Sequence, residues 1–259
     1  GRKMKQAERR KKLIQYFIQE NKEYEHLEIP EDEQAQKQLL RALMNVRMPA
    51  PVSSEFLTLQ DAYLQEEAAA KGIVDVQSLE EAGDGLYLWQ GDITALKCDA
   101  IVNAANSRLL GCFHPNHNCI DNVIHSAAGV QLRNECARIM EEQNHLEPTG
   151  QAKITSGYNL PAKYVLHTVG PIVYGRLGTT EEEQLASCYR SCLEAANKNG
   201  LKSVAFCCIS TGEFHFPNER AAEIAVQTVR QYKGDLKVVF NVFKDLDREI
   251  YSTLLRKQS

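Results

Sequence analysis

Three side chains with the donor types that zinc prefers lie close together in one short segment of this chain. Residues 111–119, GCFHPNHNC, contain Cys112, His117 and Cys119. Thiolate and imidazole are ordinary zinc ligands, and His117 and Cys119, two positions apart, can chelate one ion from a loop. Three protein ligands leave the fourth tetrahedral position for water or substrate, whereas structural sites normally use four. The spacing therefore favours a catalytic zinc site, with a chance cluster in a structural loop as the alternative.

The elements that must position this segment are short apolar runs that alternate with helical stretches from residue 86 onward. The predicted strands are 86–89, 100–103, 152–155, 164–169, 203–209 and 237–242. The predicted helices between them are 121–140, 181–199 and 218–232. This alternation predicts an α/β sheet with helices on its faces.

Two loops follow predicted strands and lead into predicted helices, which is where α/β sheets bind ligands. The first runs from the strand at 100–103 through the metal segment. The second, residues 210–214 (STGEF), follows the strand at 203–209 and precedes the helix at 218–232. Small residues before a helix start let backbone N–H groups approach an anion. A Ser-Thr-Gly turn by itself is weak evidence for phosphate.

Residues 1–83 are predicted to form a helical extension, and residues 84–259 a separate unit. Leu39, Leu40, Leu43 and Met44 make one helical stripe, and the turn-forming run GDG at 83–85 marks the boundary. The apolar stripes need burial, and no long flexible linker precedes the first strand of the second unit. We therefore expect the extension to pack on the core.

The composition narrows the class of protein. With 43% hydrophobic and 25% charged residues and no apolar run long enough for a membrane span, the chain is expected to be soluble and independent of a membrane. A net charge of −4 argues against general nucleic-acid binding. No secretory signal is visible, and the eight dispersed cysteines favour reduced thiols. The expected location is the cytoplasm.

Four motifs in order resemble the macrodomain family, which binds ADP-ribose. They are GDIT at 91–94, VNAANS at 102–107, IDNVIHSAAG at 120–129 and ISTG at 209–212. The resemblance covers about residues 86–259 and implies a three-layer α/β/α fold with a mixed central sheet. The Asn-Ala-Ala-Asn pattern and the Asp are similar to the branch that hydrolyses mono-ADP-ribosyl groups.

The chain departs from that branch at the metal segment, which replaces the usual glycine-rich loop. In this it resembles the zinc-dependent macrodomains of microbes, which also carry an N-terminal helical extension. His125 belongs to a motif shared with metal-free relatives and is expected to pack on a helix face. His114 precedes Pro115, whose bias toward extended backbone points it away from the ion.

The resemblance implies roles for individual residues. Asn106 would hold a hydroxyl of the distal ribose, and Asp121 would accept a proton from water or from a ribose hydroxyl. The alternative for Asp121 is a charge that stabilises a helix N-terminus. Zn²⁺ would either activate a bound water or fix the ribose and the scissile oxygen, and we favour the second because Asn106 and Asp121 match metal-free relatives that also hydrolyse.

The remaining contacts implied by the resemblance concern binding. Asp92 and Ile93 would bind adenine, with Asn241 near it; the alternative for Asp92 is a simple turn after Gly91. Since Glu213 carries a charge that repels phosphate, its contact would come through the backbone. The other implied substrate-binding residues are Asn103, Ser126, Ala127, Gly129, Val130, Ser210, Thr211, Gly212 and Phe214.

The leading hypothesis is a zinc-dependent hydrolase that removes mono-ADP-ribose from acidic side chains of modified proteins and releases ADP-ribose. The alternatives are a non-catalytic module that recognises ADP-ribosylated proteins, which would need neither the metal loop nor Asp121, and an O-acyl-ADP-ribose deacylase. The resemblance alone implies that the modified protein is a lipoyl carrier protein and that a sirtuin-type transferase modifies it.

Overall fold

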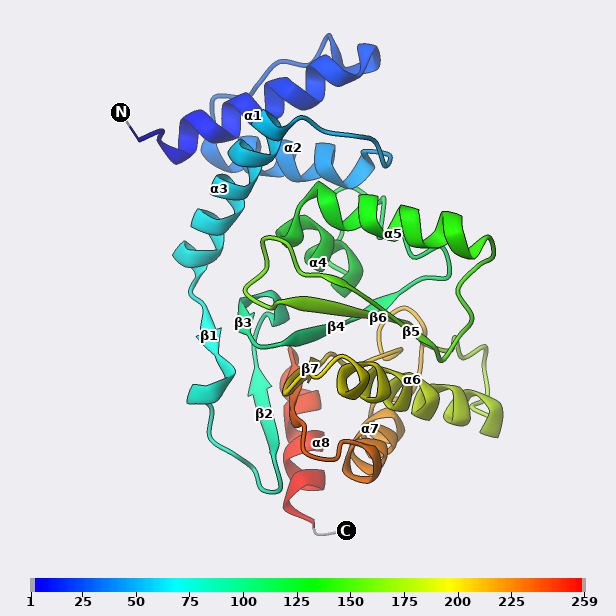
Figure 1. The fold of residues 1–259 in the computed structure, drawn as a ribbon. Helices are drawn as coiled ribbons and strands as arrows, with labels where there is room; N and C mark the ends of the chain where they lie inside the picture. Colours follow the sequence, from blue (N-terminus) through cyan, green and yellow to red (C-terminus); the bar gives the residue numbers. More distant parts are fainter. Residues whose placement is uncertain (1–2, 258–259) are drawn as a thin grey trace.

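The computed structural model describes residues 3–257 and contains one central six-stranded sheet covered by helices on both faces (Figure 1). The strands are β1 (Val74–Asp75), β2 (Leu86–Gln90), β3 (Leu96–Lys97), β4 (Ala100–Ala105), β5 (Ala152–Ser156), β6 (Tyr164–Val169), β7 (Ser203–Phe206) and β8 (Lys237–Val242). The helices are α1 (Gln6–Glu20), α2 (Glu33–Val46), α3 (Ser54–Lys71), α4 (Ile120–Ala128), α5 (Val130–Gln143), α6 (Thr179–Lys198), α7 (Asn218–Tyr232) and α8 (Asp245–Arg256). Short 3₁₀ turns occupy Lys22–Tyr24, Val76–Ser78 and Ile93–Ala95.

The sheet has the strand order β2-β8-β7-β4-β6-β5. All neighbours pair in parallel except β5, which runs antiparallel to β6, so the predicted mixed sheet is confirmed. Helices α4 and α5 cover one face, and α6, α7 and α8 cover the other (Figure 1). The inner strands β4 and β7 are buried along nearly their whole length because both faces are covered.

Two differences from the sequence-based expectation exceed a shift of one or two residues. The single helix expected at 121–140 is two helices, because Gly129 has a φ of 104° and ends α4 before α5 begins. The strand expected at 203–209 ends at Phe206. Beyond it the chain turns, with Ile209 N donating to Cys207 O at 3.1 Å and Ser210 at a φ of 67°.

Helices α1, α2 and α3 form an additional layer over α4 (Figure 1). Ser53 caps α3 by accepting a hydrogen bond from Phe56 N at 3.1 Å. Leu13, Ile14, Leu40 and Leu43 meet in a buried cluster of this layer. The same cluster includes Val130 of α5, so the layer shares a hydrophobic contact with the core.

The segment that links this layer to the sheet is itself paired. Strand β1 runs parallel to β3, with Val74 opposite Leu96. The boundary at 83/84 therefore falls between two elements that are tied to the same core. No helix within residues 3–257 combines the length and the apolar character needed to cross a membrane.

Candidate functional site

A cleft of about 370 Å³ opens where β4 ends and α4 begins. Its lining comes from the end of β4 and the loop after it, the metal loop at 111–119, the first turn of α4 and the tip of the 210–214 loop. Six of the residues singled out from the sequence contribute to it: Asn106, Cys112, Cys119, Asp121, Glu213 and Phe214. The fold therefore brings both predicted site loops to one cavity.

Cys112, His117 and Cys119 place their donor atoms within 4.8 Å of one another. Cys112 Sγ lies 3.8 Å from His117 Nδ1. Ligand atoms around tetrahedral zinc are roughly 3.5 to 4 Å apart, since Zn–S is about 2.3 Å and Zn–N about 2.0 Å. All three residues are half-buried, and Cys112 and Cys119 line the cleft. The donor set and its spacing fit a zinc ion.

The backbone of the metal loop is held in shape by local bonds. Gly111 has a φ of 84°, and a Cβ there would lie 3.0 Å from the His125 ring, so only glycine suits the start of the loop. Asn122 donates from Nδ2 to His114 O at 2.9 Å. Cys119 caps α4, its Sγ accepting from Asn122 N at 3.4 Å. Burial raises the pKa of the Cys119 thiol to about 12, so binding of a metal must release its proton.

Asp121 lies in the first turn of α4 and is only 5% exposed. Burial raises the pKa of this carboxyl to about 6, although the Asn103 hydrogen bond and the positive charge of Arg133 act in the opposite direction. His125 Nε2 is 3.6 Å from Asp121 Oδ1. Burial lowers the pKa of His125 well below its usual value, so the ring is neutral and the contact is not an ion pair. Asp121 can therefore take up a proton near neutral pH.

Asn103, expected to bind substrate, is fully buried behind Asp121. Its Nδ2 group donates to Asp121 Oδ1 at 2.8 Å and lies 3.2 Å from His167 Nδ1. Thr155 donates its hydroxyl to Ser156 O and so accepts from His167 Nε2, at 2.9 Å. This fixes the tautomer of His167 and leaves its Nδ1 to accept from Asn103. The amide thus positions Asp121 and does not line the cleft.

Asn106 follows β4 and is exposed at the cleft. Its Oδ1 accepts from Arg108 N at 3.1 Å, and its Nδ2 donates to Gly111 O at 3.3 Å. A side-chain amide has two acceptor sites and two N–H groups, so one of each stays available to a ligand. Asn106 is thereby fixed in orientation and still able to bind a hydroxyl.

The 210–214 loop has the features of an anion cradle. Ser210 adopts a φ of 67°, and its buried Oγ has no hydrogen-bond partner within residues 3–257. Thr211 donates both N–H (3.5 Å) and hydroxyl (3.0 Å) to Cys208 O. In the described part of the chain, the N–H groups of Gly212, Glu213 and Phe214 have no intramolecular acceptor. The strained backbone and unpaired hydroxyl of Ser210, together with the free N–H groups of residues 212–214, are features of a phosphate-binding loop.

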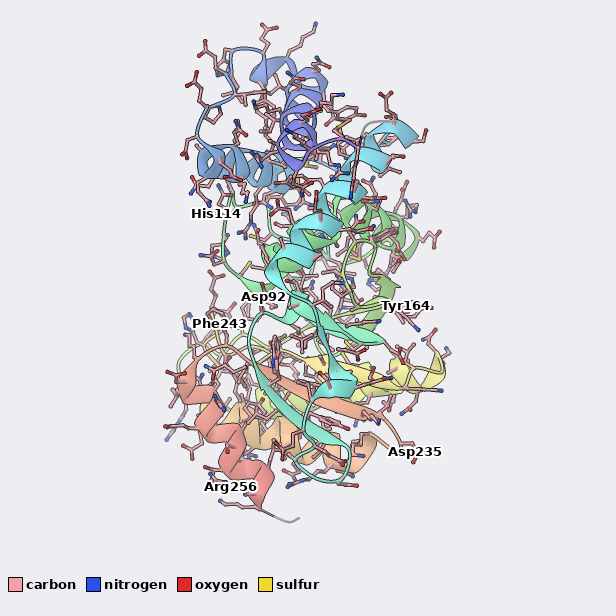
Figure 2. The ribbon with its side chains drawn as sticks, turned by 90° about the vertical axis from the view of Figure 1, so that its left-hand side faces the viewer. Asp92, His114, Tyr164, Asp235, Phe243 and Arg256 are labelled. Atoms are coloured by element: carbon pink, nitrogen blue, oxygen red, sulfur yellow. The ribbon has the colours of Figure 1, made fainter. Side chains whose placement is uncertain are left out.

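The predicted adenine end is built around the turn after β2. Asp92 is exposed, and its Oδ1 accepts from Thr94 N at 2.9 Å, so it does turn the chain. Ile93 is buried beneath this turn, and Asn241 donates from Nδ2 to Gly91 O at 3.1 Å. Asp92 and Phe243 lie toward the same edge of the molecule as His114 (Figure 2). One side of the molecule therefore carries both the metal loop and this turn.

The residues expected to bind pyrophosphate between 126 and 130 require a correction. Ser126, Gly129 and Val130 line a different cavity, which faces the end of α2. Val130 N donates to Gln60 Oε1 at 3.0 Å, and Gly129 N donates to His125 O at 3.1 Å. Ala127 packs against the core. Their backbone donors are already used by α3 and by α4 itself, so they are not free for a ligand.

Two residues that support the site loops were missed in the sequence. Gly170 faces the 210–214 loop, because a Cβ at Gly170 would lie 2.1 Å from Ser210 Oγ. Its position in a Gly-Pro pair after β6 was a usable signal. Arg133 contacts the metal loop and is buried, but nothing in the local pattern of α5 distinguishes it from a surface arginine.

Comparison with known proteins decides the family. The Macro domain family model matches residues 102–225. A "Protein-ADP-ribose hydrolase" of Treponema medium is 55% identical over 97% of this chain and 100% of the relative. A protein of the same name from Staphylococcus aureus strain MSSA476 is 49% identical over 95% of both chains. The chain belongs to the macrodomain family.

Solved macrodomains agree with this assignment. The Oceanobacillus iheyensis macrodomain with ADP is 39% identical and matches 66% of this chain and 90% of its own, with a TM-score of 0.60. The Trypanosoma brucei macrodomain in complex with ADP-ribose is 32% identical over 80% of this chain and 93% of its own, with a TM-score of 0.64. The three-layer macrodomain fold expected from the sequence is confirmed.

Proposed function

We propose that this macrodomain hydrolyses the bond between mono-ADP-ribose and an acidic side chain of a modified protein, and that it uses zinc. The observation that carries the proposal is that Asn106, Asp121, Cys112 and Cys119 line one cleft, with His117 beside the two cysteines. Relatives named protein-ADP-ribose hydrolases at 55% and 49% identity over nearly the whole chain support it.

The proposed reaction divides between the protein groups as follows. Asn106, fixed by its bonds to Arg108 and Gly111, orients a hydroxyl of the distal ribose. Asp121, aligned by Asn103, accepts a proton from the attacking water. A zinc ion bound by the three ligands would supply positive charge to the distal ribose and the scissile oxygen. The resulting products are free ADP-ribose and the unmodified protein.

The other end of the ligand is proposed to lie along the same side of the molecule. Backbone N–H groups of Gly212, Glu213 and Phe214, with the Ser210 hydroxyl, would bind the pyrophosphate, and Thr211 would shape the loop. Asp92 would accept from the adenine amino group, with Ile93 beneath it and Asn241 supporting the turn. Glu213 would contribute through its backbone, because its carboxylate is occupied with His117.

The deciding experiment is hydrolysis of a carboxylate-linked mono-ADP-ribosylated protein by the protein as purified, after chelation, and after zinc add-back. We expect activity to be lost with the metal and restored by it. Activity that survives a verified loss of zinc would make the loop structural and leave catalysis to Asn106 and Asp121. Tight ADP-ribose binding without turnover in any state would favour the reader module, and O-acyl-ADP-ribose supplied as a competing substrate tests the deacylase.

Variants test the role of Asp121 directly. Asp121→Asn keeps the shape of the side chain but cannot accept the proton, so kcat should fall by about 10²- to 10⁴-fold. Asp235→Asn, an exposed substitution far from His114 (Figure 2), is the matched control and should leave kcat unchanged. The family resemblance further suggests a lipoyl carrier protein modified by a sirtuin-type transferase as substrate. Faster turnover of that substrate than of an unrelated modified protein would support it.

A further inference from the structure

The metal loop rests on helix α2 of the N-terminal layer. Arg41 donates from Nη2 to His117 O at 2.6 Å and to Asn122 Oδ1 at 2.9 Å. Asn45, one turn later and 2% exposed, accepts from Asn116 N at 2.9 Å through Oδ1. The N–H of Asn116 and the C=O of His117 are therefore both bonded to side chains of the same helix.

Asn45 has a second bond that fixes its orientation. Its Nδ2 donates to Ser126 Oγ at 3.0 Å, and Ser126 donates to Asn122 Oδ1 at 3.1 Å. Asn122 in turn donates from Nδ2 to His114 O, and its Oδ1 accepts from Arg41 Nη2. Asn45 and Arg41 are thus joined through α4 into one closed set of hydrogen bonds beneath the loop.

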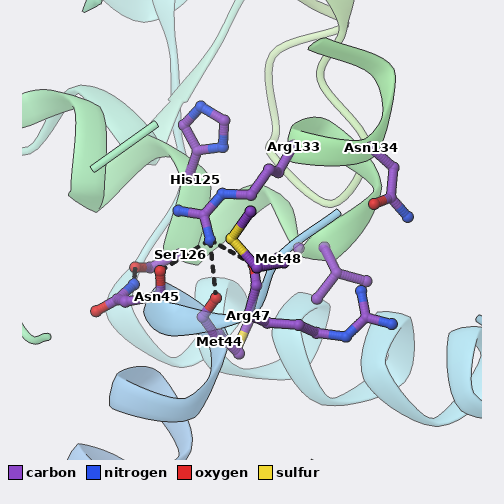
Figure 3. A pocket seen from close by; sticks show the side chains of 10 residues that line it. Met44, Asn45, Arg47, Met48, His125, Ser126, Arg133 and Asn134 are labelled. Carbon is purple, nitrogen blue, oxygen red and sulfur yellow. Dashed lines mark hydrogen bonds between the residues drawn. The ribbon is translucent and has the colours of Figure 1, made fainter. Parts of the chain in front are cut away.

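Arg133 fastens the start of the loop to the end of the same helix. Its guanidinium donates to Leu110 O at 2.7 Å and Cys112 O at 3.2 Å. It also donates to Asn45 O at 2.8 Å and Arg47 O at 2.7 Å, carbonyls that the end of α2 leaves without helical partners. Figure 3 shows Arg133 pointing at this last turn, and the Phe113 ring lies 3.7 Å from the guanidinium carbon.

These contacts matter because residues 111–119 contain no helix or strand of their own. Asn116 adopts a φ of 58°, and a loop of this kind has many backbone conformations to lose when a metal binds. A site that is already ordered loses less conformational entropy when the ion binds, and it therefore binds the ion more tightly. Two of the side chains that order it, Arg41 and Asn45, come from outside the macrodomain core, from α2.

We propose that Arg41 and Asn45 are positioning residues of the metal site, so that the N-terminal helical layer sets the zinc affinity of the macrodomain. The proposal rests on the proposed function only in taking zinc as the bound ion. It assigns the layer a role in the site itself, beyond its packing against the core through Val130.

The test measures zinc affinity by competition with a chromophoric chelator, on the full chain. Arg41→Met removes the guanidinium and keeps the aliphatic stem, Asn45→Ala removes the second contact, and Arg41→Lys retains one donor. Lys37→Met is the matched control: Lys37 lies one turn earlier on α2, where it faces Glu33 and Glu67 at 3.7 and 3.8 Å. Hydrogen exchange of residues 114–119 in the metal-free proteins is the second readout.

The expected result is a zinc Kd raised about tenfold in Arg41→Met and in Asn45→Ala, a smaller rise in Arg41→Lys, and no change in Lys37→Met. Amide exchange at 114–119 should be faster in the first two. Zinc affinity and exchange equal to those of the wild type, in variants with wild-type circular dichroism, would overturn this proposal alone. A wild-type protein that binds no zinc would overturn both it and the metal part of the proposed function.

Discussion

His117 Nε2 lies 3.1 Å from Glu213 Oε1, so the metal loop and the 210–214 loop are joined across the cleft. The other ring nitrogen, Nδ1, faces Cys112 Sγ. A histidine that offers one nitrogen to a metal and is held by a carboxylate at the other is a common arrangement, because the carboxylate fixes the tautomer and the ring orientation. The same contact couples the proposed zinc ligand to the proposed phosphate loop.

Removal of the Glu213 carboxylate should weaken zinc binding. Glu213→Ala leaves His117 Nε2 without its acceptor, and we expect zinc Kd to rise about tenfold, the low end for such partners, because the Glu213 side chain is 73% exposed. Glu213→Gln keeps an acceptor oxygen and should stay near the wild type. Glu219→Ala, an exposed substitution in the first turn of α7, is the control in the same chelator competition. Equal losses in Glu213→Gln and Glu213→Ala would show that the hydrogen bond is not the cause.

Asp92 should contribute to ligand affinity independently of the metal. A lost hydrogen bond to a charged acceptor costs about 1.5 to 3 kcal/mol, so Asp92→Ala should raise the ADP-ribose Kd by at least about tenfold in calorimetry, with zinc binding unchanged. Asp75 is the matched control, because its Oδ1 accepts from Gln77 N at 2.9 Å ahead of a 3₁₀ turn in the same way. If Asp75→Ala weakened ADP-ribose binding equally, the effect would belong to the turn and not to the ligand contact.

Stability should fall in acid because of His167. Burial lowers the pKa of His167 to about 3, so the folded protein keeps the ring neutral where the unfolded chain, with a pKa near 6.5, binds a proton. The unfolded state then holds more protons, and the unfolding free energy decreases as pH falls from about 6.5 toward 3. His125 acts in the same direction, and the raised pKa of Asp121 acts in the opposite direction below about 6.

The contribution of His167 is isolated by comparing how steeply the unfolding free energy depends on pH in the wild type and in a variant. His167→Gln should flatten the dependence of the unfolding free energy on pH by up to about 1.4 kcal/mol per pH unit in that window, since the terms from His125 and Asp121 are common to both proteins. His26→Gln, at an exposed position, should keep the wild-type slope. Denaturant melts between pH 4 and 7 provide the measurement. A wild-type slope in His167→Gln would mean that the ring is protonated in the folded state.

Bound zinc should stabilise the fold, and a lower pH should release the zinc. A ligand present at a thousand times its Kd adds about 4 kcal/mol, so zinc should raise the Tm of the chelated protein by several degrees. Because the Cys119 thiol must lose its proton, apparent zinc affinity should increase with pH. Cys119→Ser should abolish the zinc-dependent shift in a thermal melt. Cys98→Ser should keep it, because Cys98 precedes β4 and the metal loop follows the other end of that strand. An equal shift in Cys119→Ser would argue against the assigned ligands.

The N-terminal layer is expected to stay attached when the chain is cut. Residues 80–84 are exposed and form the natural site for limited proteolysis ahead of β2. The fragments 1–83 and 84–259 should nevertheless elute together on size exclusion, since α1 to α3 share a buried cluster with Val130 and β1 pairs with β3. Release of residues 1–83 as a separate folded piece would contradict the packed arrangement proposed for the two units.

The sequence determined the elements whose signals are local. Six apolar runs became the six strands of the central sheet, and the bounds of β6, α7 and β8 agree with the prediction to the residue. The donor set of Cys112, His117 and Cys119 was visible for the same reason, since all three lie in one short segment. Hydrophobic periodicity, caps and ligand spacing act over a few residues, so one chain is enough to recognise them.

Which groups meet across the molecule depends on how distant segments pack. The tertiary structure brought Glu213 to His117 and Arg41 and Asn45 to the metal loop, and it buried Asn103 behind Asp121. It also gave the N–H of Val130 to Gln60, which removed that donor from the expected pyrophosphate site. Such contacts depend on strand order and on how α2 and α3 pack over α4. No local periodicity encodes them, because the energy that selects them comes from burial and hydrogen bonding between distant segments.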